Sequence, residues 1–367
     1  PSSDTKIAYC YKANTKFESR AKAAGYTIVY LDTYTVTFKD HDGGIIKTET
    51  VQDGSDATAP ADPTRTGYAF NGWDKVFTNI TANLTVTATY TVNQYTISFD
   101  SGGGSAVTAI SQDYDTAVTA PVNPTKAGYT FNGWSPALPT KMPAESRTHS
   151  AQWTINTYNI TYNLYGGAND EFNPSTYTIE SETITLKDAS RTGYTFSGWY
   201  DAETGGNKVT SIINGSTGNV ILHARWTANT YTVTYDGNEG GAPTSASKTV
   251  TYDDTYGELA TVSRTGYTFK GWFTAASGGS EVKAIDTVKI TADTTLHAQW
   301  TINQYTITFE SNGGSSIDAI IQNYGTAVTA PTAPTKTGYT FNGWSPAVPA
   351  TMPTENVTLT AQWTPST

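Results

Sequence analysis

The feature that most constrains this chain is a seven-residue motif, the phrase Gly-Tyr-Thr-Phe-x-Gly-Trp, which occurs five times with small variations. It reads GYAFNGW at 67–73, GYTFNGW at 128–134, GYTFSGW at 193–199, GYTFKGW at 266–272 and GYTFNGW at 338–344. Successive tryptophans of the phrase are 61, 65, 73 and 72 residues apart. Self-similarity at a nearly constant period indicates an array of similar folded units. The sequence therefore predicts five small domains in tandem.

Two further markers bracket each copy of the phrase. An alternating segment such as YTVTF at 34–38 opens the unit, and a segment such as TAQW at 360–363 closes it. From the opening Tyr to the signature Trp the distance is 39, 39, 41, 41 and 39 residues, whereas from that Trp to the closing aromatic it is 17, 19, 27, 28 and 19. Length variation is thus confined to one surface loop. The third and fourth units carry the long form, DAETGGNK at 201–208 and TAASGGSE at 274–281.

The markers also predict strands. Tyr34 and Phe38 share one face of the opening segment, as in a half-buried strand. A Gly-rich turn such as DGG at 42–44 follows, which is typical of hairpins. A second alternating strand, a Pro-rich connection and the signature strand come next. Strict alternation along the signature strand places Phe131 and Trp134 on opposite faces, so we expect it to carry aromatic rings on both.

The links between units have four residues each and contain no Pro or Gly, as in TVNQ at 91–94 and TINQ at 301–304. Such links do not behave as flexible tethers. A globule of about 65 residues is roughly 28 Å across, so five in line would span on the order of 140 Å. The predicted fold class is mainly β, with five tandem small domains in a rod.

A short α/β segment precedes the first unit. Within residues 1–32, the pattern predicts a strand at about 6–11, a helix at about 15–24 that ends at Gly25, and a strand at about 26–31.

Composition excludes several classes of function. The formal charge is −10, with 22 basic against 32 acidic residues and no basic stripe, which argues against a nucleic-acid partner. No apolar run reaches about 18 residues, so we expect no membrane span. The single cysteine, Cys10, excludes an intrachain disulfide, and the Thr- and Tyr-rich composition suits an extracellular protein, at the cell surface or secreted.

Residues that could carry chemistry are scarce. His223 and His297 occupy matching strand positions and lack a second ligand at metal spacing, while His41 lies in a turn and His149 beside a strand end. Acidic residues such as Asp253 are interpreted as solvated turn residues rather than as calcium ligands. No carboxylate pair recurs from unit to unit. We therefore predict a protein that is not an enzyme and has no catalytic, cofactor-binding or metal-binding residues.

Large aromatic residues are the predicted structural signature, because a small domain without disulfides or metal needs such anchors for a core. They are Trp73, Trp134, Trp199, Trp272 and Trp344 in the signature strands, and Trp153, Trp226, Trp300 and Trp363 in the closing strands. Two more aromatics, Tyr200 and Phe273, follow the signature Trp only in the long-loop units. These two are the candidates for surface recognition.

The three spaced markers together resemble the Listeria–Bacteroides repeat, the B-repeat type found in internalin-like surface proteins of bacteria. The resemblance covers about 34–364, with YTITF, NGG, GYTFNGW and TAQW in the last unit as an example. It implies a β-grasp module strung in tandem as a spacer in secreted or wall-attached proteins, adhesive in some cases, with no catalytic residues. The segment KIAYCYKANTKFESRAKAAGY at 6–26 is similar to the closing part of leucine-rich repeat domains of the BspA-like type.

The predicted domains are the segment 1–32, repeat 1 at 33–92, repeat 2 at 93–155, repeat 3 at 156–228, repeat 4 at 229–302 and repeat 5 at 303–367. The first predicted function is an extracellular stalk or spacer with an adhesive role, whose partner is a host or neighbouring-cell surface protein or glycan. The alternative is a structural subunit that associates with itself into a filament or sheath. A carbohydrate- or host-protein-binding module is third.

Overall fold

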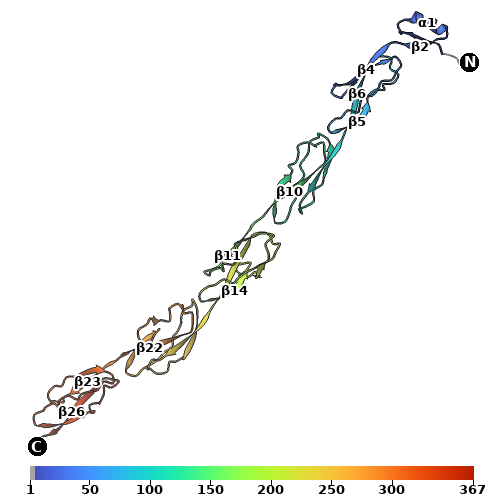
Figure 1. The fold of residues 1–367 in the computed structure, drawn as a ribbon. Coiled ribbons are helices and arrows are strands. Elements are labelled where there is room, and N and C mark those ends of the chain that lie inside the picture. Colours follow the sequence, from blue (N-terminus) through green and yellow to red (C-terminus); the bar gives the residue numbers. More distant parts are fainter. Residues whose placement is uncertain (1–4) are drawn as a thin grey trace. The chain divides into compact units, whose positions relative to one another are not determined.

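The structure, a computed structural model, describes residues 5–367 and separates into two compact units. The first unit ends at Thr157 and holds the N-terminal segment with repeats 1 and 2. The second begins at Tyr158 and holds repeats 3, 4 and 5. In Figure 1, the described residues have a helix only in the N-terminal segment, coloured blue, and strands in every repeat.

The N-terminal segment has the predicted strand–helix–strand order. Its strands β1 (Ile7–Cys10) and β2 (Thr27–Tyr30) pair in parallel, and α1 (Thr15–Ala23) connects them. The helix begins where Asn14 accepts a hydrogen bond from the backbone N–H of Phe17 at 3.3 Å, which is an N-cap. The helix prediction is confirmed, and the similarity to a leucine-rich repeat terminus stays a prediction.

Every repeat is built on one four-stranded order, second–first–fourth–third, with the opening and closing strands parallel at the centre. This is the order expected of a β-grasp sheet, so the predicted fold class is confirmed in its β content and repeated sheets. The four strands are β3 (Thr33–Lys39), β4 (Ile45–Gln52), β6 (Leu84–Val92) and β5 (Tyr68–Trp73) in repeat 1; β7 (Gln94–Asp100), β8 (Ile110–Asp113), β10 (Arg147–Ile155) and β9 (Tyr129–Ser135) in repeat 2; β11 (Tyr158–Asn163), β12 (Thr176–Tyr177), β17 (Val220–Ala228) and β14 (Tyr194–Tyr200) in repeat 3; β18 (Thr230–Asp236), β19 (Ser247–Thr251), β22 (Thr294–Ile302) and β20 (Tyr267–Phe273) in repeat 4; β23 (Gln304–Glu310), β24 (Ile320–Asn323), β26 (Val357–Pro365) and β25 (Tyr339–Ser345) in repeat 5.

The connection from the second strand to the third contains no helix in any of the five repeats. In repeat 2 it spans 114–128 and carries Pro121 and Pro124, which lack the backbone donor that a helix interior needs. The long loops of repeats 3 and 4 form hairpins, in which β14 pairs with β15 (Lys208–Val209) and β20 with β21 (Glu281–Val282). The predicted site of insertion is thus confirmed. Repeat 3 also has a small separate pair, β13 (Ile184–Thr185) with β16 (Ser211–Ile212).

The prediction that Phe131 and Trp134 lie on opposite faces of the signature strand is wrong. The register of β9 against β10 shifts between Phe131 and Trp134, which is a β-bulge. Gly133 supplies the backbone for this bulge, with φ of 103° in the region that glycine adopts without strain. The bulge adds a residue, so both rings point to the core face and meet edge to face, with centroids 5.3 Å apart. The same shift occurs in all five repeats.

The signature tryptophan packs on the core of every repeat, and it is fully buried in repeats 3 and 4. Trp199 and Trp272 are only 1% and 2% exposed, and the indole N–H groups donate to the carbonyl oxygens of Lys187 and Ala260 at 2.9 and 2.7 Å. In every repeat this ring also contacts an aromatic ring of the opening strand. The pairs are Phe38 with Trp73, Phe99 with Trp134, Tyr162 with Trp199, Tyr235 with Trp272 and Phe309 with Trp344, with centroids 4.7 to 5.1 Å apart.

The closing tryptophan packs against the Gly-rich turn that follows the opening strand and forms a hydrogen bond with it. Trp153, Trp226, Trp300 and Trp363 donate from the indole N–H to a turn carbonyl oxygen at 2.9 to 3.1 Å. A Cβ added to the turn glycine of repeat 5, Gly314, would lie 2.6 Å from the Trp363 ring, and Gly104 faces Trp153 in the same way. Glycine is therefore required at this position by close packing.

Candidate functional site

Tyr200 and Phe273, the predicted surface-recognition residues, lie at the ends of β14 and β20. Each is half-buried on the face opposite its buried tryptophan neighbour, and each pairs in register with a histidine of the closing strand. The Arg225 guanidinium lies over the Tyr200 ring, 3.7 Å from its centroid, which is cation–π geometry. A role of these two rings in recognition stays a prediction.

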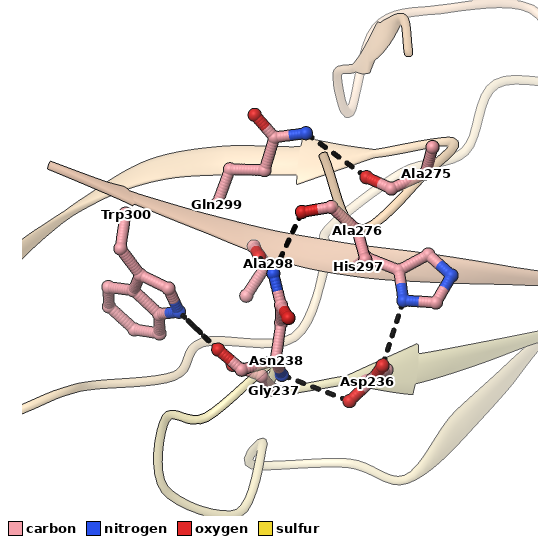
Figure 2. Close-up of polar contacts among 9 residues, drawn as sticks. All are labelled: Asp236, Gly237, Asn238, Ala275, Ala276, His297, Ala298, Gln299 and Trp300. Atoms are coloured by element: carbon pink, nitrogen blue, oxygen red, sulfur yellow. Dashed lines mark hydrogen bonds and ion pairs between the residues drawn. The ribbon is translucent and has the colours of Figure 1, made fainter. Parts of the chain in front are cut away.

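Side chains on the same face form hydrogen bonds that connect the long loops to the sheet. Figure 2 shows this surface in repeat 4: the Gln299 amide donates to the carbonyl oxygen of Ala275 at 3.0 Å, and the Asn238 amide donates to that of Ala276 at 2.9 Å. In repeat 3, Arg225 donates to two carbonyl oxygens of the corresponding loop. The long loops are therefore anchored hairpins.

The two matching histidines have polar partners at Nδ1, and His223 has a second one in the Asn163 amide nitrogen, 3.4 Å away. His297 Nδ1 lies 2.8 Å from Asp236 Oδ2, and His223 Nδ1 lies 2.6 Å from the Tyr165 hydroxyl oxygen. The backbone N–H of Asn238, and after it His297, lower the pKa of Asp236 below its ordinary value. This pair places one carboxylate beside one imidazole, and two ligands are fewer than the three protein ligands of a catalytic zinc centre.

Within residues 5–367, one group of three consecutive side chains brings metal-type ligand atoms together. Asp40, His41 and Asp42 lie in the exposed hairpin turn of repeat 1, with the ligand atoms within 4.8 Å of one another. The carboxylates already accept hydrogen bonds, Asp40 from the Tyr90 hydroxyl at 2.7 Å and Asp42 from the Gly44 N–H at 2.9 Å. These hydrogen bonds hold the turn at residues 40–42 in place, and it is called the braced turn below. The expected absence of a metal site stays a prediction.

The braced turn predicts an acid-sensitive contribution to the stability of repeat 1. His41, then the Tyr90 hydroxyl, lower the pKa of Asp40 from 3.8 to about 2. Because the folded pKa is depressed, the stabilisation is present above about pH 4 and is lost as pH falls toward about 2. Asp40→Asn should destabilise repeat 1 by about 1 kcal/mol at pH 7 and converge with the parent at pH 2. Hydrogen exchange in β3 and β6 measures this.

The control for that prediction is Asp42→Asn in the same turn, which keeps the contact to Tyr90 and should retain the pH dependence of the parent chain. If Asp40→Asn lost protection on acidification as steeply as the parent, the contact would not be the source of the acid sensitivity.

The joints are the features that recur between repeats, where one closing strand passes into the next opening strand. The signature motif begins with a Gly-Tyr pair, called here the Gly-Tyr step, and the ring of a tyrosine from the following repeat packs against this pair. The joints of this kind are Tyr114 on Gly67 and Tyr68, Tyr252 on Gly193 and Tyr194, and Tyr324 on Gly266 and Tyr267, with tyrosine centroids 6.0, 5.7 and 6.4 Å apart. A Cβ on the three glycines would lie 2.1, 2.4 and 2.0 Å from the covering ring. Only glycine permits this approach.

An asparagine connects the two sides of each of these joints. Asn303 donates its backbone N–H to the carbonyl oxygen of Gly266 at 2.9 Å, and its carbonyl oxygen accepts from the N–H of Tyr324 at 2.8 Å. Its side chain accepts from the Thr268 hydroxyl at 2.6 Å. Asn93 and Asn229 make the same two backbone bonds in the other joints. The links between these repeats are therefore hydrogen-bonded strand continuations.

The two ends of the series differ from these joints. In repeat 1 the position of the covering tyrosine holds Asp53, whose carboxylate lies 2.6 Å from Lys12 Nζ of the N-terminal segment. In repeat 5 the Gly-Tyr step is Gly338–Tyr339; no other atom lies within 4 Å of a Cβ placed on Gly338, and Tyr339 is 43% exposed.

Comparison with known proteins matches all five units to one family, described as the Listeria-Bacteroides repeat domain. The matched segments are 34–94, 95–149, 158–225, 231–299 and 305–362. No helix within residues 5–367 has the length and apolar character needed to cross a membrane.

Similar whole proteins come from two bacteria. A protein named as a Gly-rich membrane protein of Evansella cellulosilytica is 29% identical over 340 residues, covering 86% of this chain and 39% of the relative. A second membrane protein of that organism is 32% identical over 297 residues, covering 74% of this chain and 44% of the relative. Internalin H of Listeria monocytogenes is 36% identical over 143 residues, 36% of this chain and 25% of its own. The chain thus spans less than half the length of these relatives.

Proposed function

The chain belongs to the Listeria-Bacteroides repeat family, and from this premise we propose that it is a non-enzymatic extracellular stalk that spaces other parts of a bacterial surface protein. The names of its relatives, membrane proteins and an internalin, support a place at the cell surface. The family match covers most of the chain, and in every repeat the signature tryptophan packs on an aromatic ring of the opening strand, so core packing accounts for these recurring rings.

The observation that carries the proposal is the recurrent joint. A spacer keeps a set distance only if the orientation of each domain relative to the next is fixed, and a flexible link does not fix it. Tyr324 on Gly266, with Asn303 bonded to both sides, is the kind of contact that couples neighbouring repeats in arrays.

Small-angle scattering on the chromatographed chain at several concentrations tests the spacer. We expect a monomer whose maximum dimension does not change with concentration. That dimension should be on the order of 140 Å, the length estimated for five domains in line. Ordered fibres or growth with concentration would reject the spacer in favour of a self-assembling subunit.

An adhesive role would require a partner, a surface protein or glycan of a host or neighbouring cell. Binding of the chain to cells or to a glycan array, lost in Tyr200→Ala or Phe273→Ala, would support it. Retention of binding in both variants would remove these residues as the recognition surface.

A further inference from the structure

The closing strand of every repeat buries two residues in the core, two positions apart. The second is always alanine, and the first is Val86, Leu222, Leu296 and Leu359 in repeats 1, 3, 4 and 5. In repeat 2 the first position holds His149, which is 2% exposed. This corrects the prediction that His149 lies beside a strand end: it lies within β10 and occupies a core position that is aliphatic in the other four repeats.

The single hydrogen bond of His149 defines which ring nitrogen carries a hydrogen. Nδ1 lies 2.6 Å from the carbonyl oxygen of Pro136, and because a carbonyl oxygen only accepts, Nδ1 carries the hydrogen. Nε2 is buried and has no partner among residues 5–367. In the neutral ring Nε2 is a bare lone pair, whereas in the imidazolium it would be a charged donor with no acceptor.

In the described part of repeat 2, no charged side chain makes a hydrogen bond or ion pair with the His149 ring. In register, His149 faces Phe99 on β7, with ring centroids 6.4 Å apart. The charged residues of the surrounding elements make no hydrogen bond or ion pair with the imidazole; they are Asp100 on β7, Asp113 on β8, Asp115, Lys126, Lys141 and Glu145 in the connections, and Arg147 on β10. Lys141 pairs with Asp115, and Arg147 with Glu145, all exposed.

We propose that His149 makes repeat 2 an acid-labile element, in which opening of this repeat is coupled to uptake of a proton by the imidazole. Burying an unpaired charge is costly, so folding of this repeat disfavours the imidazolium form of a ring whose Nε2 is buried without a partner. An unfolded histidine titrates near pH 6.5, so the open state gains a proton below that pH and stability falls as pH falls. If the folded state takes up no proton, the opening constant rises about 30-fold by pH 5.

Repeat 5 is a matched control within the same molecule. It agrees with repeat 2 at 41 of the 61 positions compared between 94–154 and 304–364, and it carries Leu359 where repeat 2 carries His149. The neighbouring core residues are of the same types, with Met142 matching Met352 and Phe99 matching Phe309. The two repeats therefore differ at this core position chiefly by the imidazole.

Hydrogen exchange of the full chain, read on peptides of β10 and β26 and corrected for the intrinsic pH dependence of exchange, tests the proposal. Between pH 7.5 and pH 5.0, we expect protection of β10 to fall by up to about 30-fold relative to β26. His149→Leu, which restores the residue of the other repeats, should abolish the difference. Leu359→His should transfer it to β26.

Equal responses of β10 and β26 in the parent chain would overturn the proposal, as would a β10 response that persists in His149→Leu. Should Leu359→His fail to fold at neutral pH, the comparison of the parent chain with His149→Leu still decides, because that variant places a proven core residue in repeat 2.

Discussion

Trp272→Ala is expected to unfold repeat 4 within an otherwise folded chain. The Trp272 side chain is 2% exposed, and its ring contacts Tyr235 and Phe269. Truncating a buried tryptophan costs about 3–5 kcal/mol, and a domain of about 70 residues has only roughly 3–10 kcal/mol of stability in total. The substitution also removes the hydrogen bond that the indole N–H donates to the carbonyl oxygen of Ala260.

Exchange in β20 and β22, compared with β14 and β17 of repeat 3, measures this effect. Phe273→Ala is the matched control, because Phe273 is the next residue on the same strand but lies on the half-buried opposite face. We expect it to cost about 1 kcal/mol or less. A similar loss in both variants would mean that the signature tryptophan is not the anchor of the core.

The strands and the place of insertion are predictable because they depend on short-range patterns. Alternation marks the opening strand at Tyr34 and Phe38, and the constant 39 to 41 residues from the opening Tyr to the signature Trp allow only one site for added length. The bulge in the signature strand was not predicted, since a period of two assumes one residue per pleat. Gly133 between Asn132 and Trp134 was the available signal, because glycine inside a strand often marks a bulge.

The joint residues were missed for a different reason. Tyr114 and Gly67 belong to different repeats, so aligning the repeats with one another places them in different columns and hides their contact. Burial of His149, by contrast, was detectable: the aligned positions hold Val86, Leu222, Leu296 and Leu359, which is the composition of a core site. Anchoring of the long loops by Arg225 and Gln299 depends on loop conformation, which no local pattern reveals.

Gly266→Ala is expected to weaken the joint between repeats 4 and 5 beyond what its backbone strain explains. Gly266 has φ of 76°, and a Cβ there would lie 2.0 Å from the Tyr324 ring. Gly338 has φ of 75° with nothing within 4 Å, so Gly338→Ala imposes the same strain without the ring. We expect about 1–2 kcal/mol for Gly338→Ala, and about 1 kcal/mol more for Gly266→Ala from lost ring packing.

Exchange of the Asn303 and Tyr324 N–H groups, which form the hydrogen bonds of this joint, reports the difference. Tyr324→Ala completes a double-mutant cycle: if the clash is the cause, combining it with Gly266→Ala should cost less than the sum of the two single changes. Spin labels on repeats 4 and 5 should show a broader distance distribution in Gly266→Ala and an unchanged one in Gly338→Ala. Were the two glycine variants equivalent in all three measurements, the tyrosine would be incidental to the joint, and the spacer would lose the contact on which it rests.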